Sequence, residues 1–146
     1  MSIANEPSRE PLHIILSNAS TTHRRICRQE FARLNLSEGQ PKVLANLLDQ
    51  EGIVQKELAT ICSVEPATMT SLLQKLQQDG LIEKRAASVS GGKRAFCIYL
   101  TNRGRTLAES VRQIMTDAEK RAFQGFTEEE KAQFLSLITR LTNNLC

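Results

Sequence analysis

The chain contains 146 residues with a mass of 16.3 kDa, which is the size of a single domain. Its residues are 40% hydrophobic and 24% charged, with only 7 Gly and 4 Pro, so the composition excludes extended disorder and fibrous architectures. The net charge of +3 hides an asymmetry, because residues 84–105 carry six basic and no acidic side chains (+6), which leaves −3 for the remainder.

A long first helix is predicted over residues 11–34. Pro11 suits its first turn, and apolar residues recur behind it at three- and four-residue steps. A second helix follows, where Ser37 and Gln40 match a capping box. Because Pro41 lacks an amide and restricts the residue before it, we expect this helix to begin one residue later than the box implies.

Gly52 ends the second helix, and a short third helix is predicted over 54–62. The fourth helix has clearer boundaries, because Pro66 suits its first position and Asp79-Gly80 supplies a left-handed stop. Its apolar stripe consists of Met69, Leu72, Leu73 and Leu76. The opposite face is polar and almost uncharged, which is unusual for a solvated helix and typical of side chains that hydrogen-bond to base edges. The predicted DNA-contacting residues are Pro66, Ala67, Thr68, Thr70, Ser71, Gln74 and Lys75.

After Gly80 the hydrophobic period changes from 3.6 to 2, which predicts a β-hairpin. We expect strands over 81–85 and 94–101, joined by a glycine-rich tip at 88–92. In the return strand one face is expected to carry Phe96, Ile98 and Leu100, and the other Ala95, Cys97, Tyr99 and Thr101. The hairpin residues predicted to contact DNA are Arg85, Lys93 and Arg94. Alternatively, these charges only discourage aggregation at the sheet edge.

Helical spacing resumes after Thr101 and predicts two further helices, separated at Gly125. Thr127 and Glu130 match a second capping box, at the start of the last helix. That helix carries a stripe of large apolar side chains: Phe134, Leu137, Ile138, Leu141 and Leu145. Helices outside a compact DNA-binding unit need another surface to bury such stripes against, so we expect a homodimer.

Three short helices followed by a hairpin describe a winged helix-turn-helix. In this module the second helix of the turn enters the major groove, and the hairpin tip reaches the backbone or the minor groove. The expected fold class is therefore mainly α with a small β-hairpin. We assign residues 1–146 to a single domain, in which a winged helix-turn-helix DNA-binding lobe over 36–104 is flanked by dimerisation helices over 11–34 and 105–146.

Five short motifs follow one another between residues 36 and 104. They are Leu36-Ser37-x-x-Gln40-x-x-Val43-Leu44, Leu58-Ala59, Pro66-Ala67-Thr68-Met69-Thr70 with Leu72 and Leu76, Gly80-Leu81-Ile82-Glu83-Lys84, and Ile98-Tyr99-Leu100-Thr101-x-x-Gly104. In their order and spacing they resemble the MarR family of bacterial transcription regulators. The resemblance implies a homodimer that binds a pseudo-palindromic operator in double-stranded DNA, often represses, and is often released by a small ligand or an oxidant.

The resemblance has two further implications. Wings of this family usually carry an Asp two residues before the tip arginine. Here Gly92 occupies the first position and Arg94 the second, so the wing is expected to be looser before DNA binds. A ligand in this family commonly lodges between the dimerisation helices and the DNA-binding lobe. That region is expected to hold a mostly apolar set that could equally be core: Leu16, His23, Val43, Leu47 and Leu107.

Other classes of protein are disfavoured. No apolar run approaches the roughly 18 residues that cross a bilayer, and the N-terminus has no signal-peptide pattern, so a cytoplasmic protein without membrane contact is expected. The cysteines Cys27, Cys62, Cys97 and Cys146 are far apart and have no His at zinc-ligand spacing, so no metal or other cofactor is expected. No nucleophile elbow, phosphate-binding glycine loop or paired-carboxylate motif points to an enzyme.

Two alternatives stay open at this level. Arg24, Arg25 and Arg28 surround Cys27 in sequence and favour its thiolate, which makes an oxidant sensor one interpretation. Cys27 also fits the apolar stripe of its helix, where a buried thiol acts as a small hydrophobe, and this interpretation is preferred. The alternative function is a winged-helix adaptor that binds proteins without recognising DNA, and the basic strip argues against it.

Overall fold

The computed structural model describes residues 7–88 and 91–146. Within these ranges the chain forms six helices and three strands. The helices are α1 (Leu12–Arg33), α2 (Gln40–Asp49), α3 (Gln55–Ile61), α4 (Pro66–Gln78), α5 (Asn102–Ala122) and α6 (Glu128–Leu145). The strands are β1 (Ile53–Val54), β2 (Ile82–Ser88) and β3 (Arg94–Leu100), which form one antiparallel sheet in the order β1-β3-β2. The expected fold class, mainly α with a small β-hairpin, is confirmed.

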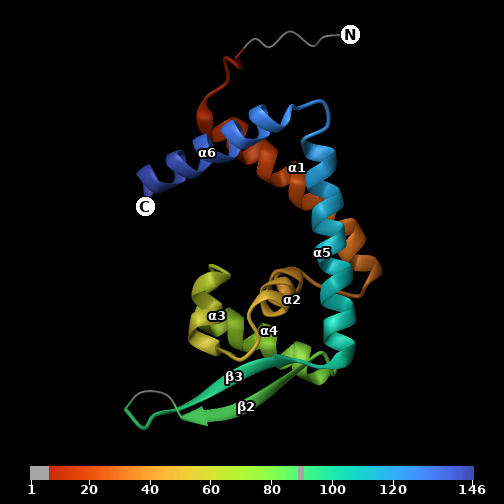
Figure 1. Cartoon of the computed structure of the whole chain (residues 1–146), viewed down its shortest axis with the longest axis vertical. Helices are drawn as coiled ribbons and strands as arrows, with labels where there is room; N and C mark the ends of the chain where they lie inside the picture. The colour runs from red at the N-terminus through yellow and green to blue at the C-terminus, as the bar shows by residue number, and fades with distance from the viewer. Residues whose placement is uncertain (1–6, 89–90) are drawn as a thin grey trace.

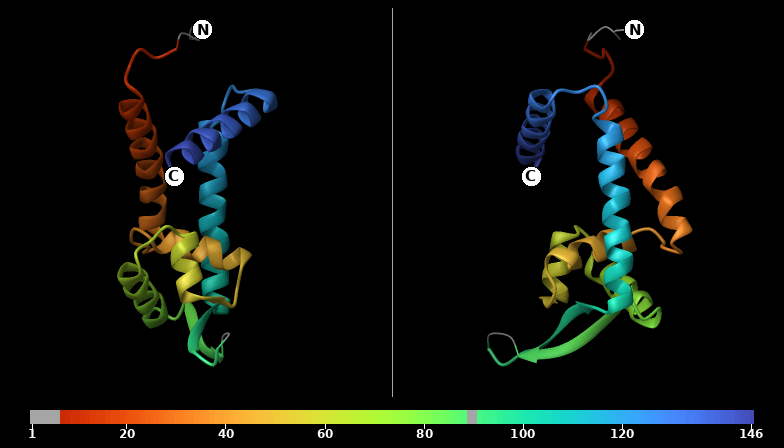
Figure 2. Two further views of the ribbon diagram at one scale, coloured as in Figure 1. Left: turned by 90° about the vertical axis from the view of Figure 1, so that its left-hand side faces the viewer. Right: turned by 45° about the vertical axis from the view of Figure 1, so that its right-hand side comes forward.

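The long helix α5 connects two groups of elements (Figure 1). The first turns of α5 lie next to α2, α3, α4 and the hairpin (Figure 1). Its last turns lie near α1 and α6 (Figure 1). Figure 2 shows α1 lying alongside α5 while α6 turns away from it, and α1 and α5 are in contact. In the described ranges, no helix is long and apolar enough to cross a bilayer.

The hydrophobic core lies where α2, α4, the sheet and the first half of α5 meet. Its fully buried side chains include Val43, Leu44, Leu47, Leu58, Met69, Leu73, Leu76, Ile98 and Val111. Burying a side chain of this size stabilises the fold by about 1.5–3 kcal/mol relative to leaving it exposed. By contrast, α6 has no buried residue.

Two helix starts differ from their predictions. Pro11 lies outside α1 as its N-cap, with φ −58° and ψ 147°, instead of in the first turn. At α2 only half of the capping box forms: Oε1 of Gln40 accepts from the backbone N–H of Ser37 at 2.9 Å, but the N-cap is Gly39. The helix therefore begins at Gln40, two residues after the box implies. Pro41 has no backbone N–H, so it is tolerated only in the first turn, where the N–H groups form no hydrogen bond within the helix.

The predicted third helix starts with a strand instead. Ile53 pairs with Ile98 and Val54 with Cys97, so α3 is shorter than the predicted 54–62. Two residues cannot show an alternating pattern, and their pairing is decided by a strand 43 to 45 positions away in sequence. Strand β2 extends to Ser88 instead of stopping at Arg85, and the predicted tip includes positions 89–90, which lie outside the described residues.

Glu51 connects the loop after α2 to both β3 and α5. Its Oε1 accepts from the backbone N–H of Leu100 at 2.9 Å, and its Oε2 pairs with the guanidinium of Arg105. The hydrogen bond from Arg105 is the main cause that holds the pKa of Glu51 below its usual value. The charged form of Glu51 therefore stabilises the junction between the wing and α5.

We expect Glu51→Gln to lower the free energy of unfolding at pH 7 by about 0.5–1 kcal/mol, because the pair is partly exposed. Since the folded-state pKa is lowered, the contribution of the carboxylate is present above its unfolded-state pKa of about 4.3 and disappears as the pH falls through the folded-state value. Urea unfolding of wild type and variant should thus differ at pH 7 and converge near pH 3. An equal difference at both pH values would contradict this assignment, and Glu109→Gln on α5 provides an exposed control.

Candidate nucleic-acid interface

Helix α4 has one face buried in the core and one face exposed to solvent. Met69, Leu73 and Leu76 are fully buried, while Leu72 is half-buried. All seven predicted contact residues of this helix are exposed: Pro66, Ala67, Thr68, Thr70, Ser71, Gln74 and Lys75. The helix begins at Pro66 and ends before Gly80, whose φ of +71° gives the left-handed stop that was predicted. Core packing therefore presents the polar face to solvent as a continuous surface.

Several polar groups on this face are already hydrogen-bonded. The hydroxyls of Thr70 and Ser71 donate to the carbonyl oxygens of Pro66 and Ala67, at 3.0 and 3.2 Å. Nζ of Lys75 lies 3.4 Å from a carboxylate oxygen of Asp79. The hydroxyl of Thr70 also accepts from Nε2 of Gln55 on α3 at 3.0 Å, a contact that sequence reasoning missed. No local signal could have shown it, since the two residues belong to different helices.

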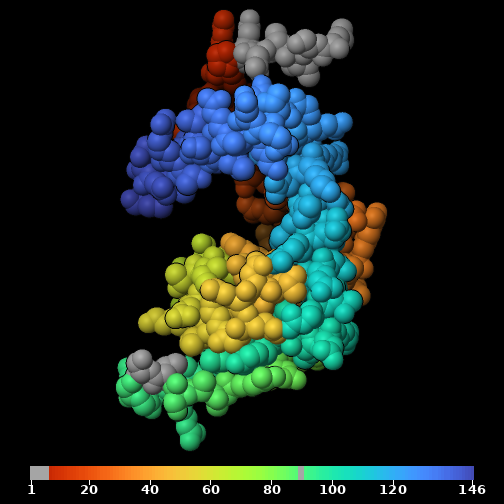
Figure 3. Space-filling model, in the orientation of Figure 1, coloured from red at the N-terminus to blue at the C-terminus, as the bar shows by residue number. Residues whose placement is uncertain are grey.

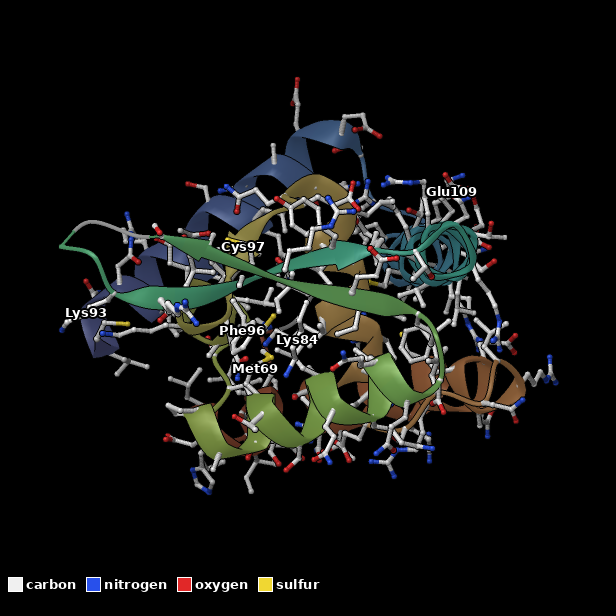
Figure 4. The ribbon with its side chains drawn as sticks, turned by 90° about the horizontal axis from the view of Figure 1, so that it is seen from below. Met69, Lys84, Lys93, Phe96, Cys97 and Glu109 are labelled. Atoms are coloured by element: carbon white, nitrogen blue, oxygen red, sulfur yellow. The ribbon has the colours of Figure 1, made fainter. Side chains whose placement is uncertain are left out.

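The register of the hairpin places Lys84 and Arg85 on opposite faces, because successive residues of a strand alternate. Figure 4 shows Lys84 and Phe96 on the side of the hairpin that faces α4, toward Met69. Arg85 lies on the other side, where its guanidinium sits 4.0 Å from the centre of the Tyr99 ring and 3.2 Å from Glu83. The structure therefore does not bring Arg85 together with α4. Lys84 takes that place, and alternation applied to the first strand could have identified it.

The tip of the hairpin carries the other two predicted contacts. Lys93 and Arg94 are both exposed, and Figure 4 shows Lys93 at the end of the hairpin away from α5. Gly92, which stands where the family usually has an Asp, has φ +72°, and no atom of the described residues lies within 4 Å of a would-be Cβ. Among the residues that the structure describes, neither Lys93 nor Arg94 forms an ion pair. Their charges are therefore available to a polyanion.

The surroundings of Cys27 differ from those expected of a reactive thiol. Its side chain is only 5% exposed, and burial raises the pKa of the thiol. Arg24 and Arg28 are directed toward Glu38, at 3.6 and 3.3 Å. Two of the three arginines that surround Cys27 in sequence therefore have their charges paired with Glu38, and the geometry favours the packing role over that of an oxidant sensor.

A cleft of about 770 Å³ lies between the end of α4, the loop after α1 and the start of α5. It is lined by Leu34, Asn35, Leu36, Lys75, Gln78, Asp79, Leu81, Arg103, Thr106, Leu107 and Ser110. Lys75 belongs both to this cleft and to the exposed face of α4. Arg103 donates to the carbonyl oxygen of Asp79 at 3.1 Å, which ties the start of α5 to the end of α4.

Three of the five residues expected around a ligand belong to the core, where Leu107 packs against the cluster that contains Val43 and Leu47. Val43 and Leu47 are fully buried in the core, and only Leu107 lines the cleft. His23 lines a separate groove of about 450 Å³ between α1 and α5. The apolar set was therefore mainly core, which the spacing alone did not distinguish.

Known proteins share both the sequence pattern and the fold. The model of the MarR family matches residues 36–89. The HTH-type transcriptional repressor Rv2887 of Mycobacterium tuberculosis strain H37Rv is 30% identical over 131 residues, which cover 90% of this chain and 93% of that protein. The structure of Rv2887 in complex with DNA is similar with a TM-score of 0.69 at 25% identity, covering 90% of this chain and 98% of that one. The S. aureus MepR–DNA complex shares the fold, with a TM-score of 0.84 at 21% identity, covering 94% and 100%.

Proposed function

Because this chain belongs to the MarR family of transcriptional regulators, we propose that it binds a pseudo-palindromic operator as a homodimer and represses a nearby operon until a small ligand releases it. The observation that carries the proposal is the exposed polar face of α4 beside a hairpin tip whose two cations are unpaired within the described residues. A relative with a matching fold that is named a repressor and has been solved with DNA supports it.

In this proposal the two elements contact different grooves. Helix α4 enters the major groove, where hydroxyl and amide groups match base edges, with the side chains of Thr68, Thr70, Ser71, Gln74 and Lys75. Pro66 and Ala67 bring the start of α4 close to the DNA backbone. Lys93 and Arg94 extend to the narrow, electronegative minor groove and neutralise the phosphates that line it. Arg85 serves only as a backbone contact, since it first has to leave Glu83 and Tyr99.

Selection from a pool of random-sequence duplexes tests this function directly. Wild-type protein should enrich a pseudo-palindrome whose half-sites lie about 10 base pairs apart, as expected for a twofold-symmetric dimer. Its affinity for the enriched duplex should fall steeply as salt rises, because phosphate contacts release counterions. Enrichment of no sequence, or binding that does not respond to salt, would exclude the proposal. Repression is tested by placing the enriched duplex in a reporter promoter.

The helices at the two ends of the chain support the dimer. Figure 3 shows a hollow between α6 and the part of the molecule that carries α3. Large apolar side chains remain exposed on and around α1 and α6: Leu12, Ile14, Ile15, Phe126, Phe134, Leu135, Leu137 and Leu145. Apolar surface of this extent marks an interaction site. We therefore assign dimerisation to 11–34 and 105–146, and DNA binding to 36–104.

Leu137→Glu should convert the dimer to a monomer. Leu137 is 46% exposed in the single chain, and a carboxylate there would be buried in both copies of a twofold interface. We expect the dimer dissociation constant to rise by a factor on the order of 100 or more. Analytical ultracentrifugation measures this, with Ser136→Glu as an exposed control one residue away. A Leu137→Glu protein that stays dimeric would show that α6 lies outside the interface.

The cleft beside α4 is the proposed site of the releasing ligand. Lys75 and Arg103 line it, and both also contact Asp79 at the end of α4. A small ligand that engages these cations would therefore disturb the helix that contacts DNA. Release by an oxidant is less well supported, since Cys27 is buried and its pKa is raised. Peroxide should accordingly leave the operator footprint unchanged, whereas loss of the footprint in wild type but not in Cys27→Ser would assign a redox role.

A further inference from the structure

A hydrogen bond joins the two helices of the helix-turn-helix at the surface proposed to meet DNA. Gln55 is the first residue of α3, and Thr70 lies in the second turn of α4. Nε2 of Gln55 donates to Oγ1 of Thr70 at 3.0 Å. Gln55 is half-buried whereas Thr70 is exposed. The glutamine therefore contacts Thr70 from the protein side and leaves the threonine side chain open to solvent.

The hydroxyl of Thr70 is part of a chain of hydrogen bonds. It accepts from Gln55 and donates to the carbonyl oxygen of Pro66 at 3.0 Å. A hydroxyl has one proton and two lone pairs, so the proton and one lone pair are in use. A hydroxyl that accepts a hydrogen bond also becomes a stronger donor, so Gln55 strengthens the bond to Pro66. One lone pair and the methyl group of Thr70 remain for another molecule.

The neighbouring hydroxyl shows what Gln55 adds. Ser71 donates to Ala67 at 3.2 Å, but among the described residues its oxygen accepts from no side chain. The hydroxyl proton of Ser71 can therefore turn toward solvent once the single hydrogen bond to Ala67 breaks. Thr70 has the same bond within the helix, yet its hydroxyl is held by a second contact from another helix.

We infer that Gln55 is a positioning residue for DNA specificity, which holds Thr70 as a hydrogen-bond acceptor toward the major groove; this inference rests on the proposed function. An acceptor matches bases that present an amino group there, which are adenine through N6 and cytosine through N4. Guanine and thymine present acceptor oxygens at the corresponding edge, so the lone pair of Thr70 would face another lone pair. One position in each half-site should therefore be adenine or cytosine.

The same random-duplex selection tests this inference with variants of the full chain. Wild type should prefer adenine or cytosine by about tenfold at one position of each half-site. Gln55→Ala should reduce that preference to about twofold, because the freed hydroxyl can turn its proton toward guanine or thymine. Its affinity for a mixed-sequence duplex should stay unchanged, since no phosphate contact is lost. Gln55→Leu, which keeps the side-chain volume, should give the same result if the alanine variant folds poorly.

Removing Thr70 distinguishes positioning from direct contact. In a Thr70→Val background, Gln55→Ala should change no base preference further, because its partner is gone. Gln77→Ala removes an exposed glutamine of α4 that is not among the predicted contacts, so it should keep the wild-type preference and serves as the control. The inference is overturned if Gln55→Ala and Gln55→Leu retain the tenfold preference, or if the Thr70→Val background shows a further change. Failure of wild type to enrich any sequence would overturn the proposed function itself.

Discussion

Gly104→Ala should lose at least about 3 kcal/mol of unfolding free energy, because the new side chain would collide with the backbone. A Cβ atom at this position would lie 1.8 Å from the carbonyl oxygen of Leu81 and 2.8 Å from its carbonyl carbon. Backbone atoms cannot move aside as the end of a flexible side chain can. The same carbonyl oxygen accepts from the N–H of Thr101 at 3.1 Å, and the N–H of Gly104 donates to the Thr101 hydroxyl at 3.0 Å. Any shift that relieves the collision therefore breaks the junction between α5 and β2.

Urea unfolding followed by circular dichroism measures this loss. Gly125→Ala is the matched control, because Gly125 has φ +86° but, in the part of the chain that the structure describes, no atom within 4 Å of a would-be Cβ. Gly125→Ala should lower the free energy of unfolding by only about 1 kcal/mol, which is the cost of a left-handed backbone conformation for alanine. If the two variants were equally stable, the close approach of α5 to Leu81 would not be what requires glycine at position 104.

Neutralising the hairpin tip should produce the largest loss of DNA binding. For the double variant Lys93→Gln with Arg94→Gln, we expect affinity for the selected operator to fall by roughly 10- to 100-fold near 0.1 M salt. The slope of log affinity against log salt should become shallower by about 2 for each hairpin, or about 4 for a dimer, since each phosphate contact contributes about 0.9. Both side chains are exposed, and within the described residues neither has to leave an acidic partner.

Arg85→Gln is the control on the same hairpin. It removes one positive charge from the opposite face, where Arg85 is already paired with Glu83 and stacked on Tyr99. Its effect on affinity and on the salt slope should be smaller than half that of the double variant. Fluorescence anisotropy titrations at several salt concentrations measure both quantities. A double variant with unchanged affinity and slope would show that the tip does not contact the phosphates.

Signals within single elements made a large part of the fold predictable. The start and stop of α4 depend on Pro66 and Gly80, and its two faces follow from helical spacing. The capping box at the start of α6 also forms as predicted, with Thr127 and Glu130 bonded in both directions at 3.1 and 2.8 Å. Each signal acts between residues at most four positions apart or through one residue's own backbone preference, so it does not depend on the rest of the fold.

Contacts between distant segments could not be predicted in this way. Strand β1 exists because Ile53 and Val54 pair with β3, and the bond from Gln55 to Thr70 crosses two helices. The burial of Cys27 and the pairing of its arginine neighbours with Glu38 likewise depend on packing. Charge counting placed Arg85 in the basic strip, but the strand register turned it away from α4.

The sequence by itself thus determined the order of the six helices and the hairpin, the polar face of α4 and the basic composition of the hairpin, because periodicity, capping and charge are local properties. Only the tertiary structure decided which cations share a face with α4, which hydroxyl on that helix is held by a second helix, and why position 104 has no room for a side chain. These depend on distances between segments that are remote in the chain, which the packing of the core sets.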